Sequence, residues 1–183
     1  QLYTADLMAD TELFFGGWSV QSEEMKWVAS ADSASVTVNG VFDNIYDQGD
    51  QINFTANTVL HIQSTQPLVC GVFALGSGTS DPAFTQIIGI NHGMTRVEFP
   101  VPTPFLAGNI LVMMQTADTG TFLYDGSTIG GWTTFPTDTS YSYRIITITS
   151  GPHSLVADSP FVPVMLVQPR TNAAYATSLG GLW

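Results

Sequence analysis

The chain has 183 residues, of which 44% are apolar and only 10% are charged, so it has enough hydrophobic material for a folded core. Four basic residues stand against fifteen acidic ones, and the net charge of −11 excludes nucleic acid and anionic membrane surfaces as partners. The longest apolar stretch, residues 109–114, is far shorter than the ~20 residues that a membrane-spanning helix needs, which excludes membrane insertion.

The two ends of the chain carry large apolar side chains outside any clear periodic pattern. They are Leu2, Tyr3, Phe14, Phe15, Leu182 and Trp183. Apolar side chains at a chain end need a partner, since leaving them in water costs free energy. We therefore expect these segments to dock on a neighbouring module or subunit, for example by adding a strand to a sheet edge. The first residue is Gln and no signal peptide precedes it, so we expect a processed or excised chain.

One pattern occurs twice. Residues 28–40, "VASADSASVTVNG", match residues 114–126, "MQTADTGTFLYDG", at a constant offset of 117 − 31 = 86. The match continues from Phe54 to Tyr143 at an offset of 89, which places Ile52 on Tyr141, and from 60–75 to 153–168 at an offset of 93. The growing offset indicates short insertions in turns. The repeat therefore predicts two units with the same order of strands.

Each copy combines hairpin turn chemistry with alternating or buried apolar strands. Asn39-Gly40 and Asp125-Gly126 accept the positive φ angles of tight hairpin turns and follow β-branched or aromatic residues. Residues 22–30 enter a strand, 67–75 form a buried strand that contains Cys70, and 140–151 form a strand buried on both faces. The predicted fold class is all-β, with two similar antiparallel β-sandwich-like units.

The predicted units are residues 1–104, which include the N-terminal segment and a structured connector at 76–108, and residues 105–183. Glycine and proline divide the connector into two or three short strands.

An acidic loop follows the first hairpin and suggests a cation site. Asp43, Asp47 and Asp50 lie within eight residues, and their hard oxygen ligands suit Ca²⁺, although a solvated turn explains the same residues. We expect no cofactor apart from this candidate calcium ion. Asn53 begins the N-glycosylation acceptor "NFT" and should face solvent, because Ile52 takes the opposite face of its strand.

The histidines do not predict catalysis or a zinc site. His61, His92 and His153 have neither a Cys nor a second His at metal-ligand spacing, and Ser154 points away from His153 as its neighbour in a strand. We interpret His153 as a structural hydrogen-bonding residue. For a glycan-active alternative, the candidate carboxylates are Glu23, Glu24 and Glu98, with Trp18 and Trp27 as exposed aromatic neighbours.

The order of motifs resembles a known family. "STQPLVCGVFA", "SDPAFTQI", "EFPVPTP", "FLYDG" and above all "YSYRIITITSGPHSLVADSPF" are similar to the IgGFc-binding protein N-terminal domain, over roughly residues 14–181. The resemblance implies a large β module of mucin-associated, cell-surface or adhesive proteins, and therefore an extracellular or cell-surface location. It does not establish antibody Fc as a ligand.

The function that we predict is a non-enzymatic adhesion or structural module that binds neighbouring modules or subunits as a homo-oligomer, matrix or filament. The chain has few Lys and Glu side chains, so little side-chain entropy and charge repulsion oppose close packing of its surface with a partner. The alternative is a carbohydrate-binding module or glycan-active enzyme.

Overall fold

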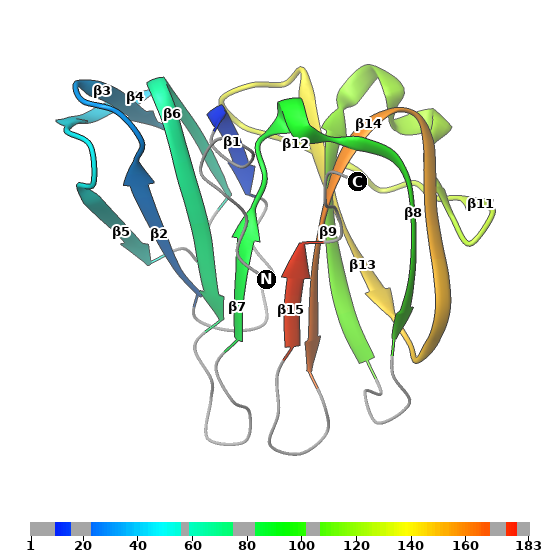
Figure 1. Cartoon of the computed structure of the whole chain (residues 1–183). Coiled ribbons are helices and arrows are strands. Elements are labelled where there is room, and N and C mark those ends of the chain that lie inside the picture. The colour runs from blue at the N-terminus through cyan, green and yellow to red at the C-terminus, as the bar shows by residue number, and fades with distance from the viewer. Residues whose placement is uncertain are drawn as a thin grey trace.

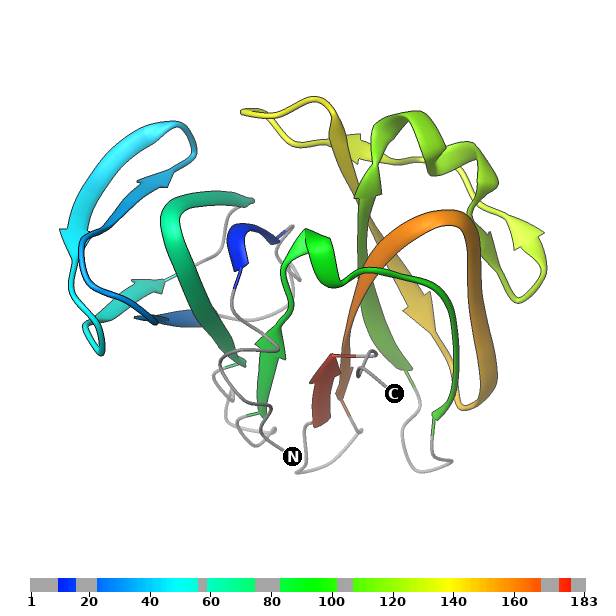
Figure 2. The ribbon, with the colours of Figure 1, turned by 45° about the horizontal axis from the view of Figure 1, so that its top comes forward.

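The computed structural model describes residues 10–15, 23–55, 59–74, 83–101, 107–168 and 175–178. These residues form two antiparallel sheets and two short 3₁₀ helices (Figure 1). Each sheet curls into half of a barrel, and the two half-barrels lie side by side (Figure 2). The predicted all-β fold with two similar units is confirmed. Within the described residues, no helix is long and apolar enough to cross a membrane.

The first sheet contains seven strands in the order β4-β3-β6-β2-β5, with β1 and β7 also paired to the long strand β6. Its strands are β1 (Asp10–Phe15), β2 (Glu23–Ala29), β3 (Ala34–Val38), β4 (Val41–Tyr46), β5 (Gln51–Thr55), β6 (Leu60–Ala74) and β7 (Ala83–Ile87). The strand entry predicted at 22–30 is β2.

The second sheet contains eight strands in the order β11-β10-β14-β9-β13-β12, with β8 and β15 also paired to the long strand β14. After η1 (Ile90–His92), its elements are β8 (Met94–Val101), β9 (Ala107–Gln115), η2 (Thr116–Thr121), β10 (Leu123–Tyr124), β11 (Ser127–Thr128), β12 (Thr133–Thr134), β13 (Tyr141–Ile148), β14 (Gly151–Gln168) and β15 (Tyr175–Ser178).

The two sheets are equivalent strand for strand. Reading the strand orders in parallel matches β4 with β11, β3 with β10, β6 with β14, β2 with β9 and β5 with β13. The strands β1 and β8 occupy equivalent places against the long strands, and so do β7 and β15. The repeat in the sequence therefore encodes the same sheet topology twice, and β12 is the strand without a counterpart among the described residues.

The hairpin turns of the two repeats have the same backbone geometry. Asn39 and Gly40 have φ angles of 51° and 76°, and Asp125 and Gly126 have φ angles of 49° and 75°. Positive φ at both central residues is the requirement of a type I′ turn, whose twist matches that of the flanking strands. The two predicted hairpins and their offset of 86 are confirmed.

The register of the strand after the hairpin differs from the sequence match. Ile52 lies opposite Trp27 in the first sheet, and Tyr143 lies opposite Met113 in the second. Because Trp27 and Met113 are equivalent at offset 86, Ile52 corresponds to Tyr143, at 143 − 52 = 91. The predicted match of Ile52 to Tyr141 was therefore wrong by two residues. A shift of two keeps every side chain on its face, so the alternation of apolar residues does not reveal it.

The connector predicted at 76–108 divides between the sheets. The strand β7 pairs with β6 of the first sheet, whereas β8 pairs with β14 of the second. The change from one sheet to the other therefore falls between residues 87 and 94, before the proposed boundary at 104/105.

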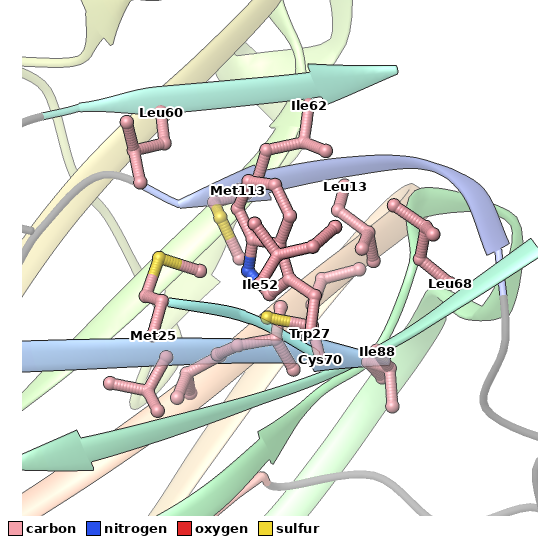
Figure 3. Close-up of a cluster of buried hydrophobic side chains, with 14 of the residues drawn as sticks. Leu13, Met25, Trp27, Ile52, Leu60, Ile62, Leu68, Cys70, Ile88 and Met113 are labelled. Atoms are coloured by element: carbon pink, nitrogen blue, oxygen red, sulfur yellow. The ribbon is translucent and has the colours of Figure 1, made fainter. Parts of the chain in front are cut away.

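The first hydrophobic core is shared by both sheets. Trp27 is fully buried at its centre and stacks on Phe54 at 4.6 Å, and Met113 of the second sheet lies beside it (Figure 3). Val162 and Val164 from β14 join the same cluster. Because side chains of both repeats bury one another there, the two halves stabilise each other.

The second core lies on the opposite face of the second sheet. Leu111 and Met113 of β9 face the first core, whereas Ile110, Val112 and Met114 face the second, and all five are buried. Burial on both faces explains the continuous apolar run of this strand. In the equivalent strand β2, Met25, Trp27 and Ala29 on one face are buried, whereas Val28 on the other face is 36% exposed.

Candidate binding surfaces

Exposed large apolar side chains gather on the first sheet. In the described part of the chain they are Val28, Val41, Phe42, Ile45 and Phe84. The repeat supplies an internal comparison for two of them. The counterpart of Val28 at offset 86 is Met114, which is fully buried, and the counterpart of Phe42 is Thr128, which is polar. The first repeat therefore exposes apolar surface at positions where the second repeat does not.

Strand β4 carries most of this exposed surface. Val41 is 70% exposed, Phe42 58% and Ile45 57%. The strand lies at the end of the sheet order, so that one side of its backbone has no neighbouring strand within the sheet. The equivalent strand β11 has two residues, whereas β4 has six. We call residues 41–46 the β4 edge.

The surroundings of the β4 edge are acidic. Asp32, Asp43, Asp47 and Asp50 are partly or fully exposed near the hairpin, and residues 28–59 contain no Lys, Arg or His. Tyr46 donates a hydrogen bond to Asp43 Oδ2 at 2.6 Å. Burial of the phenol and the negative charge of Asp43 raise the pKa of Tyr46 to about 12.

The three carboxylates predicted to bind calcium have separate partners. Asp43 accepts the Tyr46 hydroxyl, Asp47 Oδ1 accepts the Ser33 N–H at 3.2 Å, and Asp50 Oδ2 accepts the Asp47 N–H at 2.9 Å. The bonds of Asp47 and Asp50 are typical of Asp residues that stabilise turns, whereas Asp43 lies within strand β4 and not in the predicted loop. The calcium site at Asp43, Asp47 and Asp50 stays a prediction.

The acceptor Asn53 has the predicted orientation. Its side chain is exposed on β5, whereas Ile52 beside it is buried in the first core. N-glycosylation of Asn53 stays a prediction.

Of the six residues predicted to mediate assembly, two lie in a described strand and four lie outside the described residues. Phe14 and Phe15 lie in β1 and pair with His61 and Leu60 of the same chain, so this strand belongs to its own sheet. Deleting residues 1–15 would remove it together with Leu13, which is buried in the first core. The other assembly residues, Leu2, Tyr3, Leu182 and Trp183, lie outside the described residues, and their role stays a prediction.

The prediction that Trp27 is exposed for glycan binding is wrong. Trp27 is 0% exposed, because its side chain points into the core between the sheets. Alternation in β2 predicts that Trp27 shares a face with Met25, but the sequence alone does not say which face is buried. Of the other residues considered for glycan binding, Glu23 and Glu24 also lie in β2, and Glu24 forms an ion pair with Lys26 at 3.6 Å. Trp18 lies outside the described residues.

His153 has the structural role that the sequence predicts. Its Nδ1 lies 2.8 Å from Asp125 Oδ2 and 3.0 Å from the Tyr124 hydroxyl, and its Nε2 lies 2.8 Å from the Thr149 carbonyl oxygen. Partial burial favours protonation of Asp125, but hydrogen bonds from His153 and from the Ser154 N–H outweigh it and lower the pKa of that carboxyl.

An open cleft of about 700 Å³ lies beside this histidine. Its lining includes the carboxylates of Glu98 and Asp125 together with Pro100 and Pro152. Glu98 forms an ion pair with Arg96 on the same strand. The cleft combines carboxylate acceptors with flat apolar surfaces, a combination that suits a polar ligand with hydroxyl groups.

The structure brings together one cluster of candidate metal ligands that the sequence does not predict. Glu12, His61 and Asp138 each present one ligand atom, and these atoms lie within 4.8 Å of one another. Glu12 and His61 are 61 − 12 = 49 positions apart along the chain, and His61 and Asp138 are 138 − 61 = 77 positions apart. No short spacing motif in the sequence therefore predicts this cluster.

Comparison with known proteins identifies the family. The family model described as IgGFc binding protein matches residues 14–166. A search of proteins with curated functions found no match. Among solved structures, a lectin from Pleurotus ostreatus in complex with GalNAc is 10% identical, with a TM-score of 0.29 over 93% of this chain and 76% of that one.

A conserved protein of unknown function from Pseudomonas aeruginosa PAO1 is 11% identical, with a TM-score of 0.28 over 84% of this chain and 73% of that one. An anti-sigma factor domain-containing protein from Clostridium clariflavum is 8% identical, with a TM-score of 0.25 over 93% and 81%. All three scores are below 0.5, so these likenesses carry no argument about function. The family match spans most of the chain, and the chain therefore belongs to the IgGFc binding protein family.

Proposed function

We propose that this chain is a non-enzymatic extracellular adhesion module that binds protein partners by accepting an extended partner segment along the β4 edge. The observation that carries the proposal is the exposure of Val41, Phe42 and Ile45 on a strand that ends its sheet among the described residues. Membership in the IgGFc binding protein family supports a binding function and an extracellular location.

The exposed side chains supply the driving force for binding. Full burial of a large apolar side chain stabilises a complex by roughly 1.5–3 kcal/mol. Partner backbone groups would in addition bond to N–H and C=O groups along the strand edge, as in other complexes formed by strand addition. The Ile45 N–H, which donates to Asn44 Oδ1 at 2.9 Å, would exchange that acceptor for a partner carbonyl. A strand of six residues is long enough to take up such a segment, whereas the two residues of β11 are not.

A β-bulge restricts which partners fit. Val36 pairs with Asn44 and Thr37 with Phe42, so Asp43 is left as the extra residue of β4. A bulge increases the local twist, and a charge on an edge strand opposes indiscriminate pairing with other strands. The β4 edge therefore combines exposed apolar side chains with two devices that select a matching partner.

The charge of the surface favours a basic partner. The hairpin region from 28 to 59 contains only acidic ionisable side chains, apart from Tyr46, and the whole chain has only four basic residues. A second copy of the chain would therefore meet repulsion here, whereas a segment with Lys or Arg beside its apolar residues would be attracted. Self-association into a homo-oligomer or filament remains the prediction for the terminal residues.

The test compares substitutions at equivalent positions of the two repeats. The variant Val41→Lys/Phe42→Lys places charges on the β4 edge, and Ser127→Lys/Thr128→Lys places the same charges at the equivalent positions of β11 as the matched control. Binding is measured by surface plasmon resonance on immobilised IgG Fc fragment and on immobilised purified mucin, and sedimentation velocity measures self-association.

We expect the wild type and the β11 control to bind at least one of the two surfaces, and the β4 variant to lose that binding. Equal binding by the two lysine variants would overturn the proposal. So would a wild-type chain that binds neither surface.

A glycan-binding function is the second candidate, and the cleft between Glu98 and Asp125 is the observation that favours it. On a glycan array, Glu98→Gln should weaken any wild-type signal, while Glu24→Gln on the first sheet should not. A glycan signal that neither change affects would place the glycan elsewhere.

A further inference from the structure

We propose that Glu12, His61 and Asp138 form a site for a divalent transition metal, with zinc as the best fit, that fastens the two half-barrels to each other. Glu12 lies in β1 and His61 in β6 of the first sheet, and Asp138 lies in the loop between β12 and β13 of the second. Their ligand atoms lie within 4.8 Å of one another. A metal bound there would connect the two repeats.

The distances are close to those of a zinc site. His61 Nε2 lies 2.9 Å from Glu12 Oε1. Ligand atoms at about 2.0–2.2 Å from a tetrahedral metal lie about 3.3 Å from each other. Because no separation in the cluster exceeds 4.8 Å, each pair of ligand atoms has to approach by about 1.5 Å at most. Asp138 lies in a loop between two strands, where a movement of this size requires no change in strand pairing.

Neighbouring hydroxyl groups orient the ligands, as they do around established metal sites. Thr137 Oγ1 lies 3.3 Å from His61 Nδ1, which leaves Nε2 as the nitrogen directed at Glu12. The N–H and hydroxyl of Ser140 both donate to Asp138 Oδ1, so Oδ2 is the oxygen that remains for a metal among the described contacts. His61 is only 4% exposed, which excludes most water from one side of the cluster.

The donor set selects the metal. One imidazole nitrogen and two carboxylates suit zinc, with water in the fourth position, whereas Ca²⁺ prefers six to eight oxygen ligands. Because its ligands come from both sheets, such a metal binds only the folded state and should raise the stability of that state by linkage.

The full chain, freed of metal by a chelator, is titrated with ZnCl₂ by calorimetry, with CaCl₂ as the ion control, and Co²⁺ absorption bands report the coordination. The conservative variants Glu12→Gln and Asp138→Asn keep the side-chain shape, and His92→Gln is the control for adventitious binding to a histidine outside the cluster. Circular dichroism confirms that each variant is folded.

We expect one Zn²⁺ per chain, a higher melting temperature with zinc but not with calcium, and visible Co²⁺ bands. Each ligand variant should bind zinc at least about tenfold more weakly, and His92→Gln should bind like the wild type. A wild-type chain without zinc affinity, or ligand variants that bind as tightly as the wild type, would overturn the proposal.

Discussion

Asp125 is the residue whose replacement tests the structure of the repeat most sharply. Its Oδ1 accepts the Ser154 N–H at 2.8 Å, and its Oδ2 lies 2.8 Å from His153 Nδ1. Its φ angle is 49°, a conformation that strains most side chains but that Asp and Asn tolerate. Replacement by Ala removes both interactions and keeps the strained backbone.

Three contributions give the size of the expected loss. The bond to the Ser154 N–H contributes about 1 kcal/mol, and a left-handed Ala costs about 1 kcal/mol more. The interaction with His153 adds about 0.5 kcal/mol, because the Asp125 side chain is 41% exposed and solvent screens it. Asp125→Ala should therefore lower the free energy of unfolding by about 2–3 kcal/mol.

The first repeat supplies the matched control. Asn39 occupies the equivalent turn position, and its Oδ1 accepts the His61 N–H at 2.8 Å. Asp125→Asn keeps an Oδ1 acceptor for the Ser154 N–H and the tolerance of positive φ. It should therefore lower the free energy of unfolding by only about 0.5 kcal/mol. Urea unfolding monitored by circular dichroism measures both variants. Equal losses for the Ala and Asn variants, or a loss below about 1 kcal/mol for Ala, would refute the equivalence of the two turns.

Three further predictions follow from individual groups. Because the folded state lowers the pKa of Asp125, its contribution to stability is present above the unfolded pKa and is lost as pH falls through the folded value, and Asp125→Asn should flatten the acid limb of stability against pH. Cys70 is fully buried and burial raises its pKa, so a thiol reagent should react only after denaturant is added, and reaction with the native chain would contradict the shared core. Calcium bound at Asp43, Asp47 and Asp50 would raise the melting temperature, and a temperature that neither Ca²⁺ nor chelator changes would leave these carboxylates as partners of the turn.

Local chemistry explains what could be predicted from the sequence. Asn39-Gly40 and Asp125-Gly126 specify their turns through backbone preferences of the residues themselves, so the two hairpins and the offset of 86 follow from short stretches of sequence. The solvent-facing side of Asn53 follows from alternation along one strand.

Tertiary packing decides what could not be predicted. Alternation does not reveal which side of β2 is covered, and Trp27 is buried because the second sheet packs against that side. The same limit hides the shift by two residues at Ile52. The exposure of Phe42 depends on the position of β4 at the edge of the sheet, which is a property of strand order. Glu12, His61 and Asp138 come together only through pairing of distant segments and contact between the sheets.

Hydrogen exchange at the β4 edge tests the central claim most directly. The soluble partner, Fc fragment or mucin, is the one that the wild-type chain binds, and amide exchange is followed with and without it. Strand addition should slow exchange at residues 41–46, because partner carbonyl groups accept hydrogen bonds from N–H groups on the outer side of the strand, and should leave residues 127–128 of β11 unchanged. Unchanged exchange along β4, with slower exchange elsewhere on the chain, would contradict the proposal that this strand binds the partner.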